Sequence, residues 1–174
     1  MENLYAVLDD ALSPALFEAL CQLMQTPGWQ FGHRSNSDGP EQFWWRRLDE
    51  AVEPHIALKE LENWLQTRAG DGYQIQRIYA NGQTAGLDGR FHADSQQAGD
   101  FTLLVFAIPE WKPEWGGEFV LRPEGREPIY ILPKPNRALL FDATIPHMGR
   151  GPNRGCYELR VSVAFKLEAQ NVKS

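Results

Sequence analysis

The sequence predicts a mainly β protein of the α+β class, with an eight-stranded double-stranded β-helix, or jelly roll, behind two N-terminal helices. Three observations lead to this prediction. Helical periodicity is confined to residues 1–72, whereas residues 73–167 alternate short extended runs with turn sequences. The number of these runs is the number that a jelly roll requires. The helices would pack on the outer face of one sheet.

The first helix is expected to follow Ser13, a good N-cap, and to carry Pro14 at its first position. Pro27 and Gly28 would end this helix. Its apolar residues recur at helical spacing and predict one buried face: Phe17, Leu20, Cys21 and Met24. On that face Cys21 is expected to be a small core residue and not a reactive thiol.

A second helix is predicted from Glu53 to Arg68, with Gly70 as its cap. One face of this helix carries three leucines: Leu58, Leu61 and Leu65. The segment between the two helices is rich in aromatic residues. Its polar middle, Gly32–Pro40, is predicted to be a loop.

Eight extended segments follow, and turn sequences such as Asn81-Gly82 and Gly116-Gly117 separate them. They are the predicted strands Tyr73–Ala80, Arg90–Ser95, Phe101–Ile108, Gly117–Arg122, Pro128–Leu132, Arg137–Asp142, Pro146–Gly149 and Tyr157–Leu167.

Size and composition limit the possible functions. The 174 residues fit one domain, with residues 1–72 as helical support and loop, 73–167 as the catalytic core and 168–174 as a tail. The net charge of −6 disfavours a nucleic-acid partner. Two cysteines exclude a disulfide framework.

The expected location is the cytoplasm. No apolar run reaches the length of a membrane helix, and Met1-Glu2-Asn3 does not begin a secretory signal. No membrane contact is therefore expected. The sequence gives no indication of the oligomeric state.

The most informative constellation is His92-Ala93-Asp94 together with the later His147. Because side chains alternate along a strand, His92 and Asp94 would point the same way. Two imidazoles and one carboxylate, with further coordination positions open, suit non-haem Fe(II). The short motif alone equally describes a surface histidine beside a turn aspartate.

A second candidate is Arg160. Alternation places Arg160, Ser162 and Ala164 on one face of the last predicted strand. An arginine that faces the inside of a small barrel needs an anionic partner, and its planar guanidinium matches a carboxylate. The alternative is an ordinary solvent-exposed arginine.

The order of the motifs along the chain resembles the Fe(II)- and 2-oxoglutarate-dependent dioxygenases, most closely their prolyl 4-hydroxylase-like group. The motifs are Arg-x-Tyr-x-Asn, Asp-Gly-Arg-Phe-His-x-Asp, Trp-Gly-Gly-Glu-Phe, Arg-Ala-Leu-Leu-Phe-Asp, Pro-His and Arg-x-Ser. The resemblance covers residues 73–167, and the N-terminal segment 5–14 with its helix is also similar.

This resemblance implies a cupin-like jelly roll and a set of site residues. The implied iron ligands are His92, Asp94 and His147. Arg160 would bind the distal carboxylate of 2-oxoglutarate, with Ser162 close by and Tyr79 helping to hold this cosubstrate.

Two features depart from the family pattern. The gap between His147 and Arg160 is slightly longer than usual, so Arg150 and Arg154 are competitors for the cosubstrate role. Arg160 is preferred because it lies on a predicted strand. The segment Phe101–Ile108 is apolar where many relatives have a tyrosine, which predicts a less polar pocket.

The resemblance implies Fe(II), 2-oxoglutarate and O2, with ascorbate as a candidate reductant, and decarboxylation of 2-oxoglutarate to succinate and CO2. The first hypothesis is hydroxylation of a prolyl or other residue in a peptide or protein. The second is hydroxylation of a small molecule, such as a free amino acid or a natural-product intermediate. The third is a non-catalytic metal-binding jelly-roll protein.

Tryptophans are the candidate substrate wall, although ordinary core packing explains each of them equally well. They are Trp44, Trp45, Trp111 and Trp115. A long groove lined by tryptophans would favour a peptide substrate, and a closed pocket would favour a small molecule.

Overall fold

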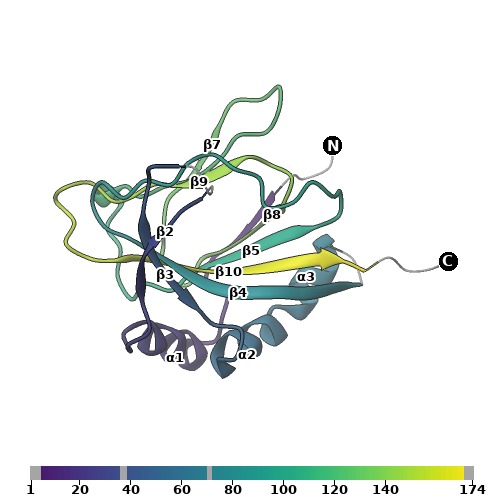
Figure 1. Cartoon of the computed structure of the whole chain (residues 1–174). Helices are drawn as coiled ribbons and strands as arrows, with labels where there is room; N and C mark the ends of the chain where they lie inside the picture. The colour runs from purple at the N-terminus through teal and green to yellow at the C-terminus, as the bar shows by residue number, and fades with distance from the viewer. Residues whose placement is uncertain (1–4, 36–38, 70–71, 171–174) are drawn as a thin grey trace.

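The computed structural model describes residues 5–35, 39–69 and 72–170, and its two β-sheets lie over a layer of helices (Figure 1). Residues outside these ranges include Gly70, the expected helix cap. The elements are β1 (Tyr5–Leu8), α1 (Pro14–Met24), β2 (Gln30–His33), β3 (Phe43–Arg47), α2 (Val52–Glu60), α3 (Glu62–Ala69), β4 (Tyr73–Gln83), β5 (Phe101–Phe106), a 3₁₀ turn (Pro113–Trp115), β6 (Phe119–Leu121), β7 (Ile129–Ile131), β8 (Ala138–Asp142), β9 (His147–Gly149) and β10 (Arg160–Ala169).

The larger sheet has seven strands in the order β1-β8-β5-β10-β4-β3-β2, and the smaller sheet has three in the order β7-β6-β9. Every named strand pairing is antiparallel. The helices lie on the outer face of the larger sheet, as predicted (Figure 1). The inner face of this sheet looks toward the smaller sheet.

The hydrophobic core joins the helices to the larger sheet. Leu20 and Leu65 are fully buried in the same cluster as Val163 and Phe165 of β10. Burial of such side chains contributes about 1.5–3 kcal/mol each. Cys21 is buried beside them, and burial raises the pKa of its thiol to about 11, consistent with the expected core role.

The second predicted helix is divided. Leu61 separates α2 from α3, because its backbone leaves the regular helical geometry while its N–H still bonds to the carbonyl of Ala57. Leu61 is 2% exposed and belongs to the core, so the irregular residue remains packed. No helix among the described residues is long and apolar enough to cross a membrane.

The N-terminal region contains more than the predicted helices and loop. Strand β1 pairs with β8, and β3 pairs with β4, so this region extends both sides of the larger sheet. Part of the predicted loop Gly32–Pro40 belongs to β2. These strands are short and are defined by partners far along the chain, which a local sequence pattern does not reveal.

The segment predicted as strand Arg90–Ser95 is not a regular strand. Its only ladder contact among the described residues is an isolated antiparallel bridge between His92 and His147. The described chain therefore has seven strands from β4 to β10, where eight were expected. The last strand begins at Arg160, later than predicted, because Tyr157 and Glu158 are exposed loop residues.

Side-chain alternation on β10 is as expected. Val161, Val163 and Phe165 are buried among the core residues. Arg160 and Ser162 point to the opposite, inner face, where they line a cavity between the two sheets. The inner face of the larger sheet therefore carries the candidate site.

Asn136 connects the turn before β8 to the segment before α1. Its side chain accepts a hydrogen bond from the Leu12 N–H at 2.9 Å and donates one to the Leu12 carbonyl at 2.8 Å. Its φ of 58° lies in the left-handed region, which asparagine tolerates better than most residues.

We expect Asn136→Ala to lower the free energy of unfolding by about 2 kcal/mol, since it leaves two buried backbone groups without partners. Urea denaturation measures the effect. Asn136→Gly is the control for the backbone, because glycine adopts the positive φ freely. Equal losses in the two variants would assign the effect to the hydrogen bonds, and no loss in either would contradict their role.

Candidate active site

Two histidines and an aspartate meet where the smaller sheet faces the larger one. His92 and His147 exchange two backbone hydrogen bonds, of 3.1 and 2.9 Å, which bring together segments far apart in sequence. The Asp94 N–H bonds to the Ala143 carbonyl at 2.9 Å, which fixes Asp94 on the same side. The potential ligand atoms of the three residues lie within 4.8 Å of one another.

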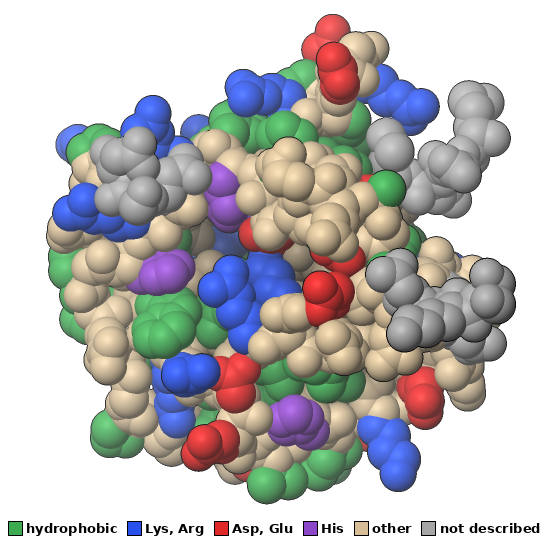
Figure 2. Space-filling view, turned by 45° about the vertical axis from the view of Figure 1, so that its right-hand side comes forward, with side chains coloured by type: hydrophobic (Ala, Val, Ile, Leu, Met, Phe, Trp, Pro, Cys, Tyr) green, Lys and Arg blue, Asp and Glu red, His purple; other side chains and the backbone are tan. Residues whose placement is uncertain are grey.

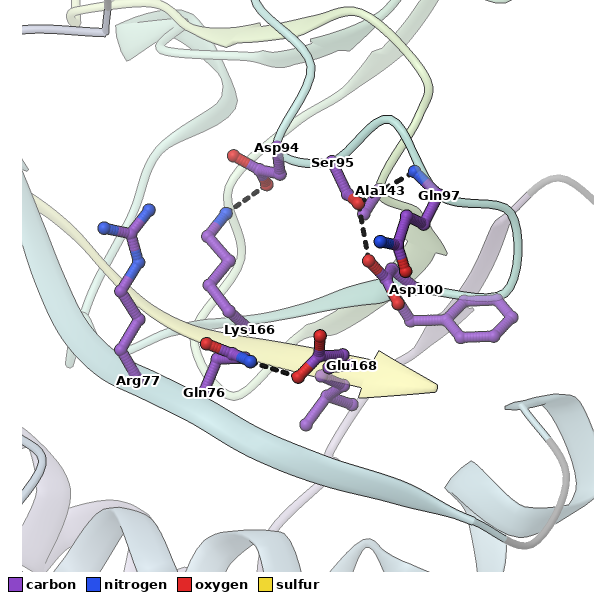
Figure 3. A pocket seen from close by; sticks show the side chains of 11 residues that line it. Gln76, Arg77, Asp94, Ser95, Gln97, Asp100, Ala143, Lys166 and Glu168 are labelled. Atoms are coloured by element: carbon purple, nitrogen blue, oxygen red, sulfur yellow. Dashed lines mark hydrogen bonds and ion pairs between the residues drawn. The ribbon is translucent and has the colours of Figure 1, made fainter. Parts of the chain in front are cut away.

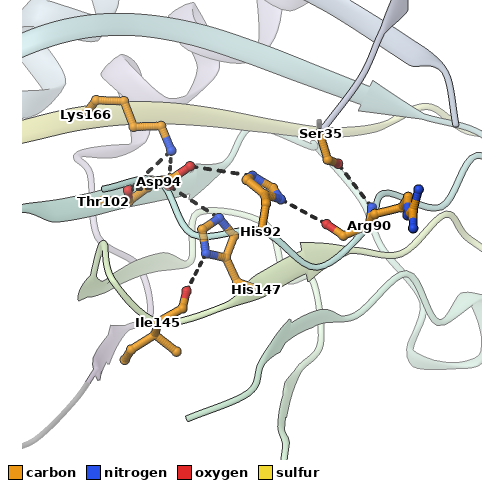
Figure 4. A network of polar contacts seen from close by, with 8 residues as sticks. All are labelled: Ser35, Arg90, His92, Asp94, Thr102, Ile145, His147 and Lys166. Atoms are coloured by element: carbon orange, nitrogen blue, oxygen red, sulfur yellow. Dashed lines mark hydrogen bonds and ion pairs between the residues drawn. The ribbon is translucent and has the colours of Figure 1, made fainter. Parts of the chain in front are cut away.

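Both imidazoles are oriented for metal binding (Figure 4). The Nδ1 atom of His92 lies 2.9 Å from the Arg90 carbonyl, and that of His147 lies 2.8 Å from the Ile145 carbonyl. A carbonyl only accepts, so we assign the proton of each ring to Nδ1, which leaves the Nε2 lone pair free. The two Nε2 atoms lie 3.5 and 3.3 Å from Asp94 oxygens.

The protonation states suit the same role. Burial lowers the pKa of His147, so this imidazole is neutral at neutral pH. Burial alone would raise the pKa of Asp94, but the positive charge of Lys166 lowers it, and the pKa stays well below its ordinary value. A neutral imidazole and an ionised carboxylate are the forms that bind a metal ion.

Asp94 also has two neighbours on the inner face of the larger sheet (Figure 4). The Thr102 hydroxyl donates to its Oδ2 at 2.6 Å, and Lys166 forms an ion pair with the same oxygen. Such partners orient a metal-binding carboxylate. Neither residue was predicted from the sequence, although Lys166 continues the alternation of Arg160, Ser162 and Ala164.

A narrow cavity connects the histidines to Arg160. It is lined by both histidines and by the inner-face residues of β10 and β4. The cosubstrate candidates Arg160, Ser162 and Tyr79 are among these lining residues. The competitors Arg150 and Arg154 are exposed and do not line it.

Arg160 is 1% exposed, yet its guanidinium is only partly satisfied. Its Nε donates to the Gly117 carbonyl at 2.5 Å and its Nη1 to Gln83 Oε1 at 2.9 Å, whereas the buried Nη2 has no hydrogen-bond partner among the described residues. Burial lowers the pKa of Arg160 to about 10, so the side chain stays charged at neutral pH. A buried charge with a free donor is suited to an anionic ligand.

The four tryptophans do not line this cavity or the larger one next to Asp94. Trp111 donates to the Gly116 carbonyl at 3.0 Å and contacts Trp115 edge-on. Trp45 stacks on His33, and Trp44 contacts Phe31. Each of the four therefore packs against another aromatic ring.

Gly117 lets the backbone pass close to the side chain of Arg160. Its φ is +77°, and a Cβ atom there would lie 3.1 Å from Arg160 Cδ and 3.2 Å from Trp111 Cζ2. Gly125 has a similar φ of +66°, but a Cβ atom there would meet no atom of the described residues within 4 Å.

A positive φ costs an L-residue about 1 kcal/mol. We expect Gly117→Ala to lower the free energy of unfolding by more than this amount. Gly125→Ala is the matched control, because it bears only the backbone cost. Urea denaturation of both variants measures the difference. Equal losses of unfolding free energy in the two variants would show that the close approach of the added Cβ atom to Arg160 does not destabilise the protein.

Of the comparisons with known proteins, the one with solved structures bears on the fold. No family model matches the chain, and no curated protein does. Among solved structures, an oxidoreductase of the 2OG-Fe(II) oxygenase family from Burkholderia pseudomallei is 18% identical, with a TM-score of 0.72 over 98% of this chain and 89% of its own. A prolyl hydroxylase from Trichoplax adhaerens, in complex with a hypoxia inducible factor peptide fragment, is 17% identical, with a TM-score of 0.73 over 96% and 84%.

A third structure is the α-ketoglutarate-dependent non-haem epimerase SnoN from nogalamycin biosynthesis. It is 11% identical, with a TM-score of 0.73 over 97% of this chain and 79% of its own. The chain therefore has the fold of the 2OG-Fe(II) oxygenases, which confirms the predicted fold class. Proteins with different activities share this fold, so the function must be argued from the site.

Proposed function

We propose that this chain is an Fe(II)- and 2-oxoglutarate-dependent oxygenase that hydroxylates an organic substrate. The observation that carries the proposal is a single cavity with two different anchors. His92, Asp94 and His147 offer metal ligands at one part of it, and the unpartnered Nη2 of buried Arg160 lies at another. Two histidines and one carboxylate leave coordination positions open, as non-haem Fe(II) oxygenases require.

The same residues fit 2-oxoglutarate, which carries carboxylates at both ends. Arg160 would bind the distal carboxylate through its free Nη2, and Gln83 and Gly117 keep the guanidinium in place. The Ser162 hydroxyl and Tyr79 line the path from Arg160 to the histidines. Leu104 also lines this path and adds apolar surface to it.

When bound, Fe(II) with 2-oxoglutarate supplies the oxidising chemistry, in which O2 is consumed and succinate and CO2 are released. The protein supplies position and shielding. The Arg90 and Ile145 carbonyls hold the two imidazoles in the metal-binding tautomer. Phe119 and Phe141 pack against His147, with ring centroids at 5.4 and 4.7 Å, and limit the access of water.

The second cavity suggests where the substrate lies. It has a volume of about 340 Å³, includes Asp94 in its wall and is not lined by tryptophan. The lining without tryptophan is not the long aromatic groove that would favour a peptide, so we prefer the small-molecule hypothesis. Hydroxylation of a prolyl or other peptidyl residue is the second candidate, supported by the peptide-bound prolyl hydroxylase of the same fold.

Anaerobic titration with Fe(II) and 2-oxoglutarate, followed by a succinate-release assay in air, tests the proposal. We expect 2-oxoglutarate to bind only to the metal-loaded protein, and succinate to form in the presence of O2. If the protein binds Zn(II) but releases no succinate with any substrate tested, the result would instead support the hypothesis of a non-catalytic metal-binding protein. Ascorbate is included as reductant.

A further inference from the structure

Two basic residues face each other on the inner face of the larger sheet. Lys166 of β10 and Arg77 of β4 are direct partners in the antiparallel register. Both approach the ring of Tyr79, with Lys166 Nζ 5.5 Å and Arg77 Cζ 5.2 Å from its centroid, so both point to the same side. Like charges directly opposite each other destabilise a sheet.

Among the described residues, an ion pair compensates only one of these two charges. Lys166, 9% exposed, forms its ion pair with the metal-ligand candidate Asp94. Within the described ranges, no carboxylate forms an ion pair with Arg77. A divalent cation bound at Asp94 would add two positive charges next to Lys166. The metal-loaded site would therefore attract a further anion.

Both basic residues line the cavity of about 340 Å³ beside Asp94. Figure 3 shows Arg77 and Lys166 extending from neighbouring strands toward this cavity. Figure 2 shows Lys and Arg side chains grouped in a hollow of this face, with acidic side chains beside them. The position is next to the metal site but separate from Arg160, which does not line this cavity.

Two acidic residues line the same cavity away from Asp94 (Figure 3). Glu168 accepts hydrogen bonds from the amides of Gln74 and Gln76 on one oxygen, Oε2. Asp100 is held by the Ser95 hydroxyl and by the Ala169 N–H. Their partners are neutral, and no ion pair with a described basic residue compensates either charge.

We infer that the primary substrate is a small zwitterion of the amino-acid type, whose carboxylate binds Arg77 and Lys166 and whose ammonium group lies toward Glu168. This inference rests on the proposed function and names its substrate class. Separate basic and acidic groups in one small cavity complement such a molecule. An internal residue of a peptide has neither a free carboxylate nor a free ammonium group at its backbone, so it would leave both charged regions unmatched.

The test uses the full chain with Fe(II) and 2-oxoglutarate and takes the L-amino acids as probes. We expect at least one of them to stimulate succinate release and to bind the anaerobic loaded protein in calorimetry. The amide of that amino acid, which lacks the carboxylate charge, should bind about tenfold to a hundredfold more weakly, as the loss of a charge-assisted contact predicts. A peptide with both termini blocked should give no stimulation.

Variants assign the contacts. Arg77→Gln should weaken calorimetric binding of the stimulating amino acid by about tenfold to a hundredfold. Arg126→Gln, which removes an exposed arginine of the β6–β7 loop, is the matched control and should leave binding unchanged. Glu168→Gln should weaken binding of the amino acid but not of its analogue without the amino group.

The outcomes separate this inference from the proposed function. If 2-oxoglutarate binds with Fe(II) but no amino acid binds, or the blocked peptide stimulates as well, the substrate class is overturned and the oxygenase proposal stands. Equal binding by the Arg77→Gln and Arg126→Gln variants overturns the assigned contact. Failure of metal-dependent 2-oxoglutarate binding would reject both proposals.

Discussion

Replacing His92 or His147 with alanine is expected to reduce 2-oxoglutarate-dependent succinate release to background, a loss of at least about a hundredfold. Loss of a residue that only hydrogen-bonds to a metal ligand typically lowers metal affinity or activity by about 10- to 100-fold. Here a ligand itself is removed. The structure gives each histidine one available nitrogen, Nε2, because a backbone carbonyl occupies the other. A two-ligand site cannot hold the metal with the same affinity.

Metal binding is the second measurement for these variants, and Fe(II) titration under anaerobic conditions should show the same loss. His147 is 3% exposed, so His147→Gln is added to preserve volume. His55→Ala is the matched control, because this exposed histidine lies outside the cavity and bonds to the Asp49 carbonyl. Full succinate release by a folded His92 or His147 variant would remove that residue from the site.

Arg160→Ala is expected to raise the KM for 2-oxoglutarate by roughly a hundredfold, with a smaller effect on kcat. A hydrogen bond to a charged group contributes about 1.5–3 kcal/mol, and a bidentate contact with the distal carboxylate would contain two of them. The unpartnered Nη2 supplies one of these donors. Steady-state kinetics with varied 2-oxoglutarate measures the change.

Controls for this variant use the competing arginines and the conservative change. Arg150→Gln and Arg154→Gln should retain the KM, because both side chains are exposed outside the cavity. Arg160→Lys should recover part of the affinity, since it restores charge but not the planar fork. A normal KM in Arg160→Ala, with a raised KM in either competitor, would move the cosubstrate site to that arginine.

Periodicity and spacing predicted the part of the site that depends on local geometry. The separation of His92 and Asp94 placed both side chains together, although the segment forms one bridge and not a strand. The alternation of Arg160 and Ser162 extends two further steps to Lys166, which was not predicted. Arg160 and Ser162 could be anticipated because they lie on a strand, whose geometry repeats every two residues.

Features that depend on distant partners could not be predicted in this way. Strands β1, β2 and β3 exist because the larger sheet offers them edges to extend, as in the pairing of β3 with β4. The pairing of Lys166 with Arg77 follows from the register of β10 on β4, which includes an irregularity just after Lys166. Register is determined by the assembled sheet and turns. The proximity of Lys166 and Arg77 therefore could not be predicted from the sequence alone.

The bridge between His92 and His147 also bears on how long a metal ion would stay bound. Strand β9 has three residues and belongs to a three-stranded sheet, so its opening requires far less than global unfolding. Such an opening would separate His147 from the other two ligands. The dwell time of the ion should therefore shorten as local opening of β9 becomes more favourable, and amide hydrogen exchange at His147 reports the free energy of that opening.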